Sequence, residues 1–162
     1  MSETTPSYVT PGMAVLTPYL ICDGAAAAID FYVQVFEAKE VGERFVDADG
    51  RIGHAELEIG GAQLHLADLY DGFGMSPAGL PDSPVALGLY APDVDAALAR
   101  AEAAGGTIIS PVEETFYGAR RFRLRDPFGH RWIVATHAHD VTPEDYEKAV
   151  EGFAQTPSSD VS

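Results

Sequence analysis

The sequence predicts an α+β fold in which two tandem βαβββ modules form a curled mixed sheet around a cleft, with a further helix at the C-terminal end. Two observations predict it. The stretch from Leu16 to Leu69 has the order strand, helix and three strands, and the stretch from Val85 to Thr136 repeats that order. Glycine-containing turns stand at corresponding places in both stretches. Two small sheets with one helix each can pack against each other and leave a cleft between them.

The first module, residues 13–69, begins with an apolar strand from Val15 to Cys22. Apolar residues at helical spacing then mark one helix face, made of Ala25, Ala28, Ile29, Tyr32, Val33 and Phe36. Three strands follow, from Glu40 to Val46, from Ile52 to Ile59 and from Ala62 to Ala67, and Gly60-Gly61 is a hairpin signal between the last two.

The second module, residues 85–139, begins with a strand from Val85 to Tyr90, and Asp93 is a suitable N-cap for the helix that follows. The buried stripe of this helix is Val94, Ala97, Leu98 and Ala101, and Gly105-Gly106 ends it. The remaining predicted strands are Thr107 to Ile109, Thr115 to Arg125 and Arg131 to Thr136. A tight turn at Asp126-Pro127-Phe128-Gly129 joins the last two, and His130 is predicted to face solvent in this turn.

The other segments are predicted to be a flexible N-terminal segment (1–12), a linker loop between the modules (70–84), a C-terminal helix (140–154) and a disordered tail (155–162). Thr142-Pro143-Glu144-Asp145 is a strong helix start. The apolar face of that helix is predicted to dock on the body of the molecule or on a partner subunit.

Charge and composition restrict the class of protein. In 162 residues, ten Lys and Arg stand against 25 Asp and Glu, a formal net charge of −15, which argues against binding to nucleic acid and to anionic membrane surfaces. No apolar run approaches a membrane span, and we expect a cytoplasmic protein. Cys22 is the only cysteine, and its alternation with Pro18 and Leu20 predicts a core residue, not a nucleophile.

Several short motifs carry a family resemblance. They are Thr17-Pro18-Tyr19-Leu20-Ile21, Ile29-Asp30-Phe31-Tyr32, Gly53-His54-Ala55-Glu56-Leu57, Asp93-Val94-Asp95-Ala96-Ala97 and Asp126-Pro127-Phe128-Gly129-His130-Arg131-Trp132. With the duplicated modules they resemble the vicinal oxygen chelate superfamily, which includes glyoxalase I, extradiol dioxygenases and the fosfomycin- and bleomycin-resistance proteins, and within it the PhnB-like glyoxalase-related branch. The resemblance implies a small-molecule cleft and a homodimer, but one fold supports many chemistries. Relatives commonly end the first helix with glycine where this chain has Glu37.

Strand alternation separates the two faces of each predicted sheet. One face is apolar and should contact the helices, with Ala55, Leu57, Ile59, Leu64, Leu66, Leu87, Leu89, Phe122 and Leu124. The opposite face should line the cleft. Its candidate catalytic residues are Glu56 and His65, and its candidate substrate-binding residues are Thr17, Tyr19, His54, Gln63, Tyr90, Arg121 and Arg123.

Metal-using members of the superfamily place ligands on the first and last strand of each module. By this resemblance, and by counting from the turn glycines, His65 corresponds to Ile133, and the other two positions fall near Thr17 and Ala86. Since a firm divalent site needs about three or four ligands, we expect no metal cofactor, although an ion at His65 is not excluded. His54 and Glu56 with His65 could also form a metal site, but a hydrogen-bonded polar cluster is the better interpretation. His137 and His139 with Asp140 have similar spacing, and we interpret them as exposed histidines.

Three functions remain open from the sequence, and the third is a structural or interaction role in which the cleft is unused. Glu56 with a neighbouring histidine could remove a proton next to a carbonyl while Arg121 or Arg123 stabilises the oxyanion, as in a lyase or isomerase. Glu56 and Arg123 could instead form an ordinary cross-strand ion pair, which we favour. The alternative function is a metal-free protein of the bleomycin-resistance type, which holds a drug or metabolite without chemistry.

Overall fold

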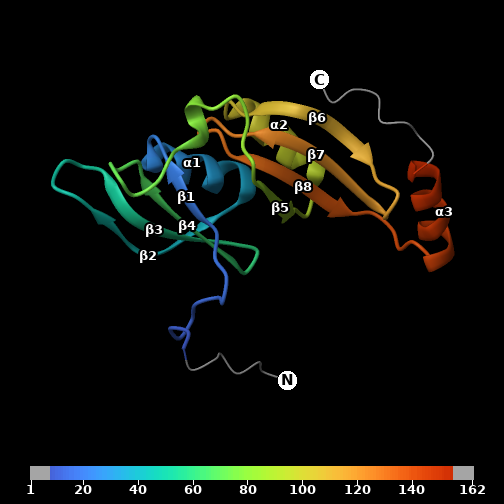
Figure 1. The fold of residues 1–162 in the computed structure, drawn as a ribbon, viewed down its shortest axis with the longest axis horizontal. Helices are drawn as coiled ribbons and strands as arrows, with labels where there is room; N and C mark the ends of the chain where they lie inside the picture. Colours follow the sequence, from blue (N-terminus) through green and yellow to red (C-terminus); the bar gives the residue numbers. More distant parts are fainter. Residues whose placement is uncertain (1–7, 155–162) are drawn as a thin grey trace.

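The computed structural model describes residues 8–154, which form two four-stranded sheets, three α-helices and one short 3₁₀ helix (Figure 1). The elements are β1 (Tyr19–Cys22), α1 (Ala25–Phe36), β2 (Lys39–Val46), β3 (Ile52–Ile59), β4 (Ala62–Asp68), η1 (Pro77–Gly79), β5 (Ala86–Tyr90), α2 (Val94–Ala103), β6 (Thr107–Glu114), β7 (Ala119–Arg125), β8 (Arg131–His137) and α3 (Pro143–Ala154).

Both sheets have the same strand order. The first is β1-β4-β3-β2 and the second is β5-β8-β7-β6. The first strand of each module runs parallel to the last, while the other pairs are antiparallel. The predicted fold class of two βαβββ modules and a C-terminal helix is therefore confirmed.

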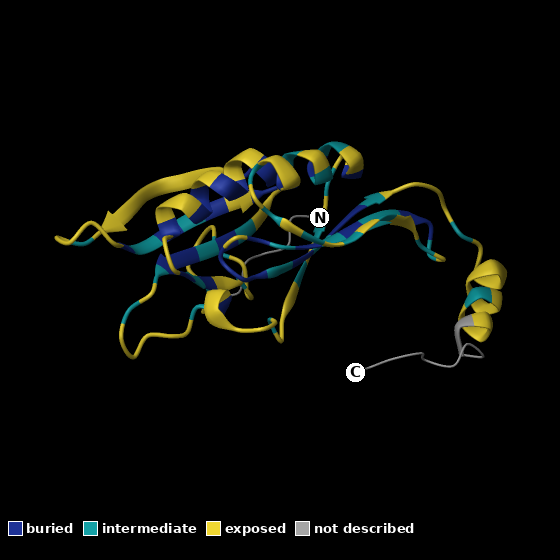
Figure 2. Cartoon of the chain, turned by 90° about the horizontal axis from the view of Figure 1, so that it is seen from above, coloured by how far each residue is buried: buried dark blue, intermediate teal, exposed yellow. Residues whose placement is uncertain are grey.

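One hydrophobic core joins the two modules. The apolar strand face predicted from the sequence packs there, and four of its side chains are 0% exposed: Leu57, Leu66, Phe122 and Leu124. The ring of Trp132 on β8 lies 4.6 Å from the ring of Phe36 at the end of α1. Figure 2 shows the buried residues between the helices and the sheets, whereas the outer faces of the helices are exposed. The modules therefore form one folded unit.

Asp126 anchors the turn between β7 and β8 inside this core. Its carboxylate is 3% exposed and accepts hydrogen bonds from the Tyr32 hydroxyl (2.7 Å) and from Trp132 Nε1 (2.9 Å). The backbone N–H groups of Phe128 and His130 donate to it as well. Because Tyr32 belongs to the first module, these bonds join the two modules.

The prediction that His130 faces solvent is wrong. Its side chain is buried, and Nε2 lies 3.7 Å from Sγ of Cys22, whose place in the core is confirmed at 0% exposure. Burial lowers the pKa of His130 and, with the nearby Asp126 carboxylate, raises the pKa of Cys22 to about 12. The turn packs inward because Gly129, with φ 93°, brings it against the backbone of Pro77, where a Cβ would come within 2.5 Å.

Two predicted strand bounds were wrong. The first strand begins at Tyr19 rather than Val15, since Pro18 cannot donate to a ladder and Leu16 is 87% exposed. The strand predicted from Thr115 to Arg125 is divided: β6 reaches Glu114, and a turn through Gly118 (φ 80°) precedes β7. A Cβ on Gly118 would collide with the carbonyl oxygen of His139, so this glycine is required by close packing.

The linker between the modules, 70–84, is held against the second sheet. Arg125 on β7 donates to the carbonyl oxygens of Pro77 (2.9 Å), Leu80 (2.5 Å) and Pro81 (3.0 Å). Arg131 adds an ion pair of 2.8 Å with Asp82. The linker contains η1 and is fixed along its second half.

Both ends of the described chain extend from the body (Figure 1). Gln63 holds the N-terminal segment, because its amide donates to Gly12 O (2.7 Å) and accepts from Ala14 N (2.8 Å). At the other end, α3 stands apart from both sheets, with the Tyr146 ring 5.5 Å from that of Phe116. Residues 1–7 and the predicted tail 155–162 lie outside the described residues. No helix among residues 8–154 is long and apolar enough to cross a membrane.

Candidate functional site

Four polar side chains gather on the face of the first sheet opposite α1. Strand register places Tyr19 on β1 beside His65 on β4, and His65 beside Glu56 on β3. His54 lies two residues before Glu56 and therefore on the same face. We call Tyr19, His54, Glu56 and His65 the histidine cluster. Of the nine candidate site residues, these four are brought together.

Hydrogen bonds connect three members of the cluster in a line. His54 Nε2 lies 3.2 Å from Glu56 Oε1, and His54 Nδ1 lies 2.9 Å from the Tyr19 hydroxyl. An ionised carboxylate can only accept, so Nε2 carries the proton in the neutral ring and Nδ1 accepts from Tyr19. Burial raises the pKa of Tyr19, which keeps its hydroxyl protonated at neutral pH. The line therefore holds the His54 ring in one tautomer and orients the Tyr19 hydroxyl.

His65 occupies the centre of the cluster without a partner for one nitrogen. Its Nε2 atom is buried and has no hydrogen-bond partner among the described residues. The ring meets Tyr19 and His54 edge to face, with centroids 6.1 Å and 5.2 Å away. Such ring contacts compensate a buried polar atom weakly. A ligand atom would remove the deficit once a neighbouring ring moves aside, because the nitrogen is buried as it stands.

Tyr19 lines one hollow, and Phe73, whose ring lies beside it, lines another. One, of about 370 Å³, lies between β1, the start of β5 and the linker, and Tyr19, Leu80 and Leu87 contribute to its lining. The other, of about 260 Å³, is lined by Asp47, Gly53, Tyr70 and Phe73. The Phe73 ring lies 6.1 Å from that of Tyr19. Both volumes suit a small organic molecule or part of one.

Tyr70 and Phe73 belong to the linker and were not among the candidate residues. The Tyr70 hydroxyl donates to Asp47 Oδ2 at 2.6 Å, and this bond raises the pKa of Tyr70 to about 12. The guanidinium of Arg51 lies 4.0 Å from the centre of the Tyr70 ring. The signal that could have pointed to them is the pair of aromatic residues in a loop otherwise rich in Gly and Pro.

Arg121 and Arg123 lie on β7 in the second sheet, not beside Glu56. Their nearest acid is Glu113 on β6, at 3.2 Å and 3.7 Å. The cross-strand pair of Glu56 and Arg123 favoured from the sequence is therefore wrong, because their strands belong to different sheets. The two positions do correspond by duplication, since Glu56 pairs with His65 as Arg123 pairs with Ile133.

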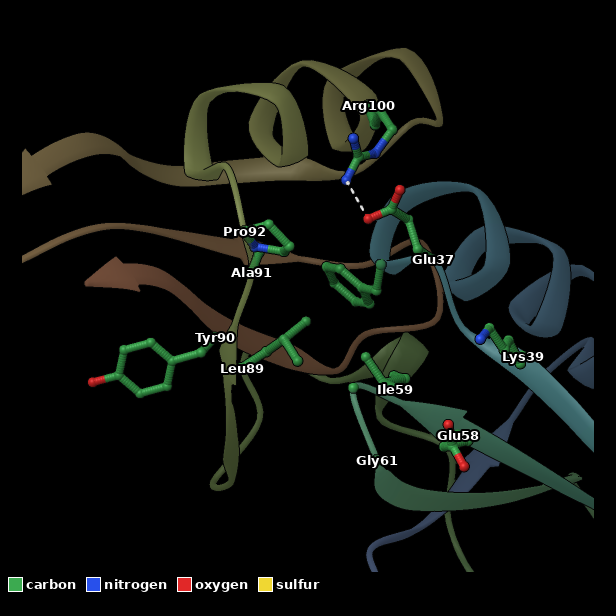
Figure 3. A pocket seen from close by; sticks show the side chains of 12 residues that line it. Glu37, Lys39, Glu58, Ile59, Gly61, Leu89, Tyr90, Ala91, Pro92 and Arg100 are labelled. Carbon is green, nitrogen blue, oxygen red and sulfur yellow. Dashed lines mark ion pairs between the residues drawn. The ribbon is translucent and has the colours of Figure 1, made fainter. Parts of the chain in front are cut away.

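The other three candidate residues lie outside the cluster. Thr17 precedes β1, and Tyr90 is 69% exposed at the end of β5. The side-chain amide of Gln63 is hydrogen-bonded to the N-terminal segment. In Figure 3 the Tyr90 ring points away from the other labelled side chains.

Within residues 8–154, no group of three His, Cys, Asp or Glu side chains is arranged to hold a metal. His65 pairs with Tyr19 in the first module. The equivalent pair in the second module is Ile133 and Gly88, neither of which has a side chain that can bind a metal. His137 forms an exposed pair with Asp140 at 3.2 Å.

Comparison with known proteins identifies relatives of this architecture. A sequence profile of the Glyoxalase/Bleomycin resistance protein/Dioxygenase superfamily matches residues 12–134. The uncharacterized protein Rv0887c of Mycobacterium tuberculosis is 38% identical over 139 residues, which cover 83% of this chain and 81% of the relative.

Solved structures agree with that match. TioX from Micromonospora sp. ML1 superposes with a TM-score of 0.61 at 28% identity, covering 77% of this chain and 99% of TioX. A putative 3-demethylubiquinone-9 3-methyltransferase, the PhnB protein from Bacillus cereus, has a TM-score of 0.57 at 20% identity, covering 76% of this chain and 99% of its own. The latter likeness concerns the fold alone.

Proposed function

The chain belongs to the Glyoxalase/Bleomycin resistance protein/Dioxygenase superfamily, and on this premise we propose that it binds a small organic molecule at the histidine cluster. The observation that carries the proposal is the buried Nε2 of His65 without a protein partner. Leaving such an atom unsatisfied costs about 1–3 kcal/mol, which a ligand hydroxyl or carbonyl group would recover. An apolar or aromatic body would contact Tyr19, which lines one hollow, or Phe73, which lines the other.

The test is a thermal-shift screen of small aromatic alcohols, ketones and acids against the wild-type chain. Hits are then measured by calorimetric titration against His65→Ala and, as a matched control, His137→Ala, which removes an exposed histidine outside the cluster. We expect His65→Ala to weaken binding by about tenfold, equivalent to about 1.4 kcal/mol, and His137→Ala to leave it unchanged. Equal loss in both variants, or no loss in either, contradicts the assignment.

A second function is favoured by the hydrogen-bonded line from Glu56 through His54 to Tyr19. In this lyase or isomerase reaction, His65 Nε2 takes a proton from the carbon next to a ligand carbonyl. The Tyr19 hydroxyl turns from His54 Nδ1 to the oxyanion that develops and donates its one proton there. Arg121 and Arg123 contribute only when the second sheet of another copy faces the cluster.

Chemical analysis of the bound hit separates the two functions. Incubation with wild-type protein followed by mass spectrometry and NMR of the recovered ligand detects isomerisation or bond cleavage. If the protein is an enzyme, Glu56→Gln should lower turnover by about 10²-fold or more while the melting temperature stays within a few degrees. A hit recovered unchanged after long incubation supports binding alone.

We further propose that neither function requires a metal and that the protein acts in the cytoplasm as a homodimer. Support for the first point is the donor set around His65, which is complete for no divalent ion within the described residues. Support for the dimer is the exposed apolar surface at both ends of the body: Leu16 is 87% exposed at one end, and Tyr146 and Val150 are 47% and 41% exposed at the other.

A further inference from the structure

A third hollow lies at the junction between the modules, beside the C-terminal end of α1, and has a volume of about 350 Å³. It is lined by the end of α1, the β3–β4 turn, the end of β5 and α2 (Figure 3). None of its lining residues belongs to the histidine cluster or to the two hollows beside Tyr19. We call it the junction pocket.

Arg100 supplies a positioned cation to the junction pocket. Its Nε donates to the carbonyl oxygen of Val35 in the last turn of α1 at 3.1 Å, and its side chain is one-third exposed, at 33%. This hydrogen bond links α2 to α1 and orients the guanidinium group. Since a guanidinium has five N–H donors, its two terminal nitrogens are left to receive an anion in the bidentate manner that suits carboxylates.

Glu37, the residue that ends α1, lies beside this cation. Its Oε2 lies 3.8 Å from the nearest Arg100 nitrogen, beyond hydrogen-bond distance, and its side chain is 67% exposed. Among the described residues it is the one non-glycine with positive φ, at 58°, a conformation that favours glycine. This conformation ends α1, since Glu37 is its C-cap and its backbone N–H donates to Tyr32 O, and the same turn places the carboxylate loosely at Arg100.

The opposite wall of the pocket is apolar and rigid. Leu89 and Ile59 lie below the ion pair in Figure 3, and Pro92 lies to one side. Phe36, which also lines the pocket, is 6% exposed and is fixed by Trp132. Lys39 and Glu58, cross-strand partners on β2 and β3, place one charge of each sign at the far rim. An occupant therefore needs an anionic group at one end and an apolar body.

We propose that the junction pocket is a second binding site, for a small carboxylic acid with an aromatic or branched apolar body. The ligand carboxylate accepts two hydrogen bonds from Arg100, and Glu37 moves aside into solvent. A cation is a poorer fit, because the partly buried group is Arg100 and both acids lie at the exposed rim. The site spans both modules, from Ile59 in the first to Leu89 and Arg100 in the second.

The probe is 3-phenylpropanoate, compared with 3-phenylpropanamide, in NMR titrations of the ¹⁵N-labelled full chain at about 0.15 M salt. We expect the acid to bind with a Kd of about 1 mM and the amide about tenfold more weakly. The amides of Gly60, Gly61 and Leu89 should shift, whereas that of His65 should not.

Three variants test the assigned contacts. Arg100→Gln should weaken binding of the acid by about tenfold and abolish the difference in affinity between acid and amide. Glu37→Gln should strengthen binding of the acid severalfold, because the competing carboxylate is gone. Arg120→Gln, which removes an exposed arginine paired with Asp95 outside the pocket, should change nothing.

Equal binding of acid and amide, absence of saturable shifts up to about 20 mM acid, or shifts centred on His65 would overturn the proposal. An unchanged Kd in both Arg100→Gln and Glu37→Gln would do the same. If Arg100→Gln fails to fold, as judged by circular dichroism, the comparison of acid with amide and the Glu37→Gln result still decide. The histidine cluster and the junction pocket share no residue, so either proposal can fail alone.

Discussion

Single buried polar residues set the geometry of this molecule. The carboxylate of Asp126 accepts hydrogen bonds from α1, from its own turn and from β8. It lies near the buried pair of Cys22 and His130. Each of these groups is costly to bury alone and acceptable when paired. Together they fix how the first module sits on the second.

Replacing Asp126 with Asn should lower the free energy of unfolding by about 2–3 kcal/mol. Asn keeps one acceptor oxygen and turns an N–H₂ group towards donors such as Tyr32 and Trp132, so at least one buried donor loses its partner. Urea unfolding followed by fluorescence of the single Trp132 measures the change. Asp49→Asn, at an exposed turn, is the control; similar small changes in both variants would show that the buried network adds little.

Cys22 makes stability depend on alkaline pH. Burial raises the pKa of its thiol to about 12, above the value in the unfolded chain, so the folded state favours the protonated form. Its stabilising contribution is present below about pH 8.5 and is lost progressively as the pH rises towards 12. Melting temperatures should therefore fall between pH 8 and pH 10 more steeply for wild type than for Cys22→Ala. Parallel slopes would contradict this.

At the residue scale, the sequence predicted what depends on strand alternation. It placed Leu57 and Phe122 in the core and put Tyr19, His54, Glu56 and His65 on one face. It did not predict the burial of His130, because a tight turn usually faces solvent, whereas this one is anchored by Asp126 and packed against Pro77 at Gly129. That contact joins residues far apart in the chain, and no local pattern reveals it.

At the scale of elements, the linker forms a wall of the candidate site. Arg125 and Arg131 hold its second half on the second sheet, and its first half brings Tyr70 and Phe73 to the histidine cluster. The sequence identified a linker from its Gly and Pro content but not this anchoring, because the carbonyl groups that Arg125 contacts leave no trace in side-chain patterns.

Arg125→Gln should release the linker. Three carbonyl groups lose their donor, so limited proteolysis should cut between residues 70 and 84 several times faster, while the unfolding free energy changes by about 1 kcal/mol. Arg120→Gln is the matched control, since Arg120 bonds Asp95 and not the linker. Cleavage at the wild-type rate would mean that Gly129 and the core contacts hold the linker without Arg125.

At the scale of the whole molecule, the duplication is retained in architecture and lost in chemistry. Equivalent positions carry Glu56 and Arg123, or His65 and Ile133, so one sheet presents the histidine cluster and the other presents arginines. The sequence predicted the pairing of equivalents from turn spacing. It predicted one sheet for each module as well, and the expected ion pair of Glu56 with Arg123 was wrong because it joined strands of different modules.

The proposed dimer should respond to salt in a defined direction. Two chains of charge −15 repel each other, and salt screens this repulsion, so the dimer fraction in sedimentation velocity should rise from low salt to about 0.3 M NaCl. Val150→Asp should weaken the dimer at every salt concentration, whereas Lys148→Gln on the same helix should not. A monomer under all conditions would remove the dimer from the account.

The account depends on His65 as the contact for a small-molecule ligand. The most direct measurement is histidine-selective ¹⁵N NMR of the full chain, titrated with the strongest hit of the thermal-shift screen. The account predicts a saturable shift of the His65 Nε2 resonance at the same Kd as calorimetry, and a smaller shift at His54. Saturable binding that leaves the His65 resonances unmoved would contradict it.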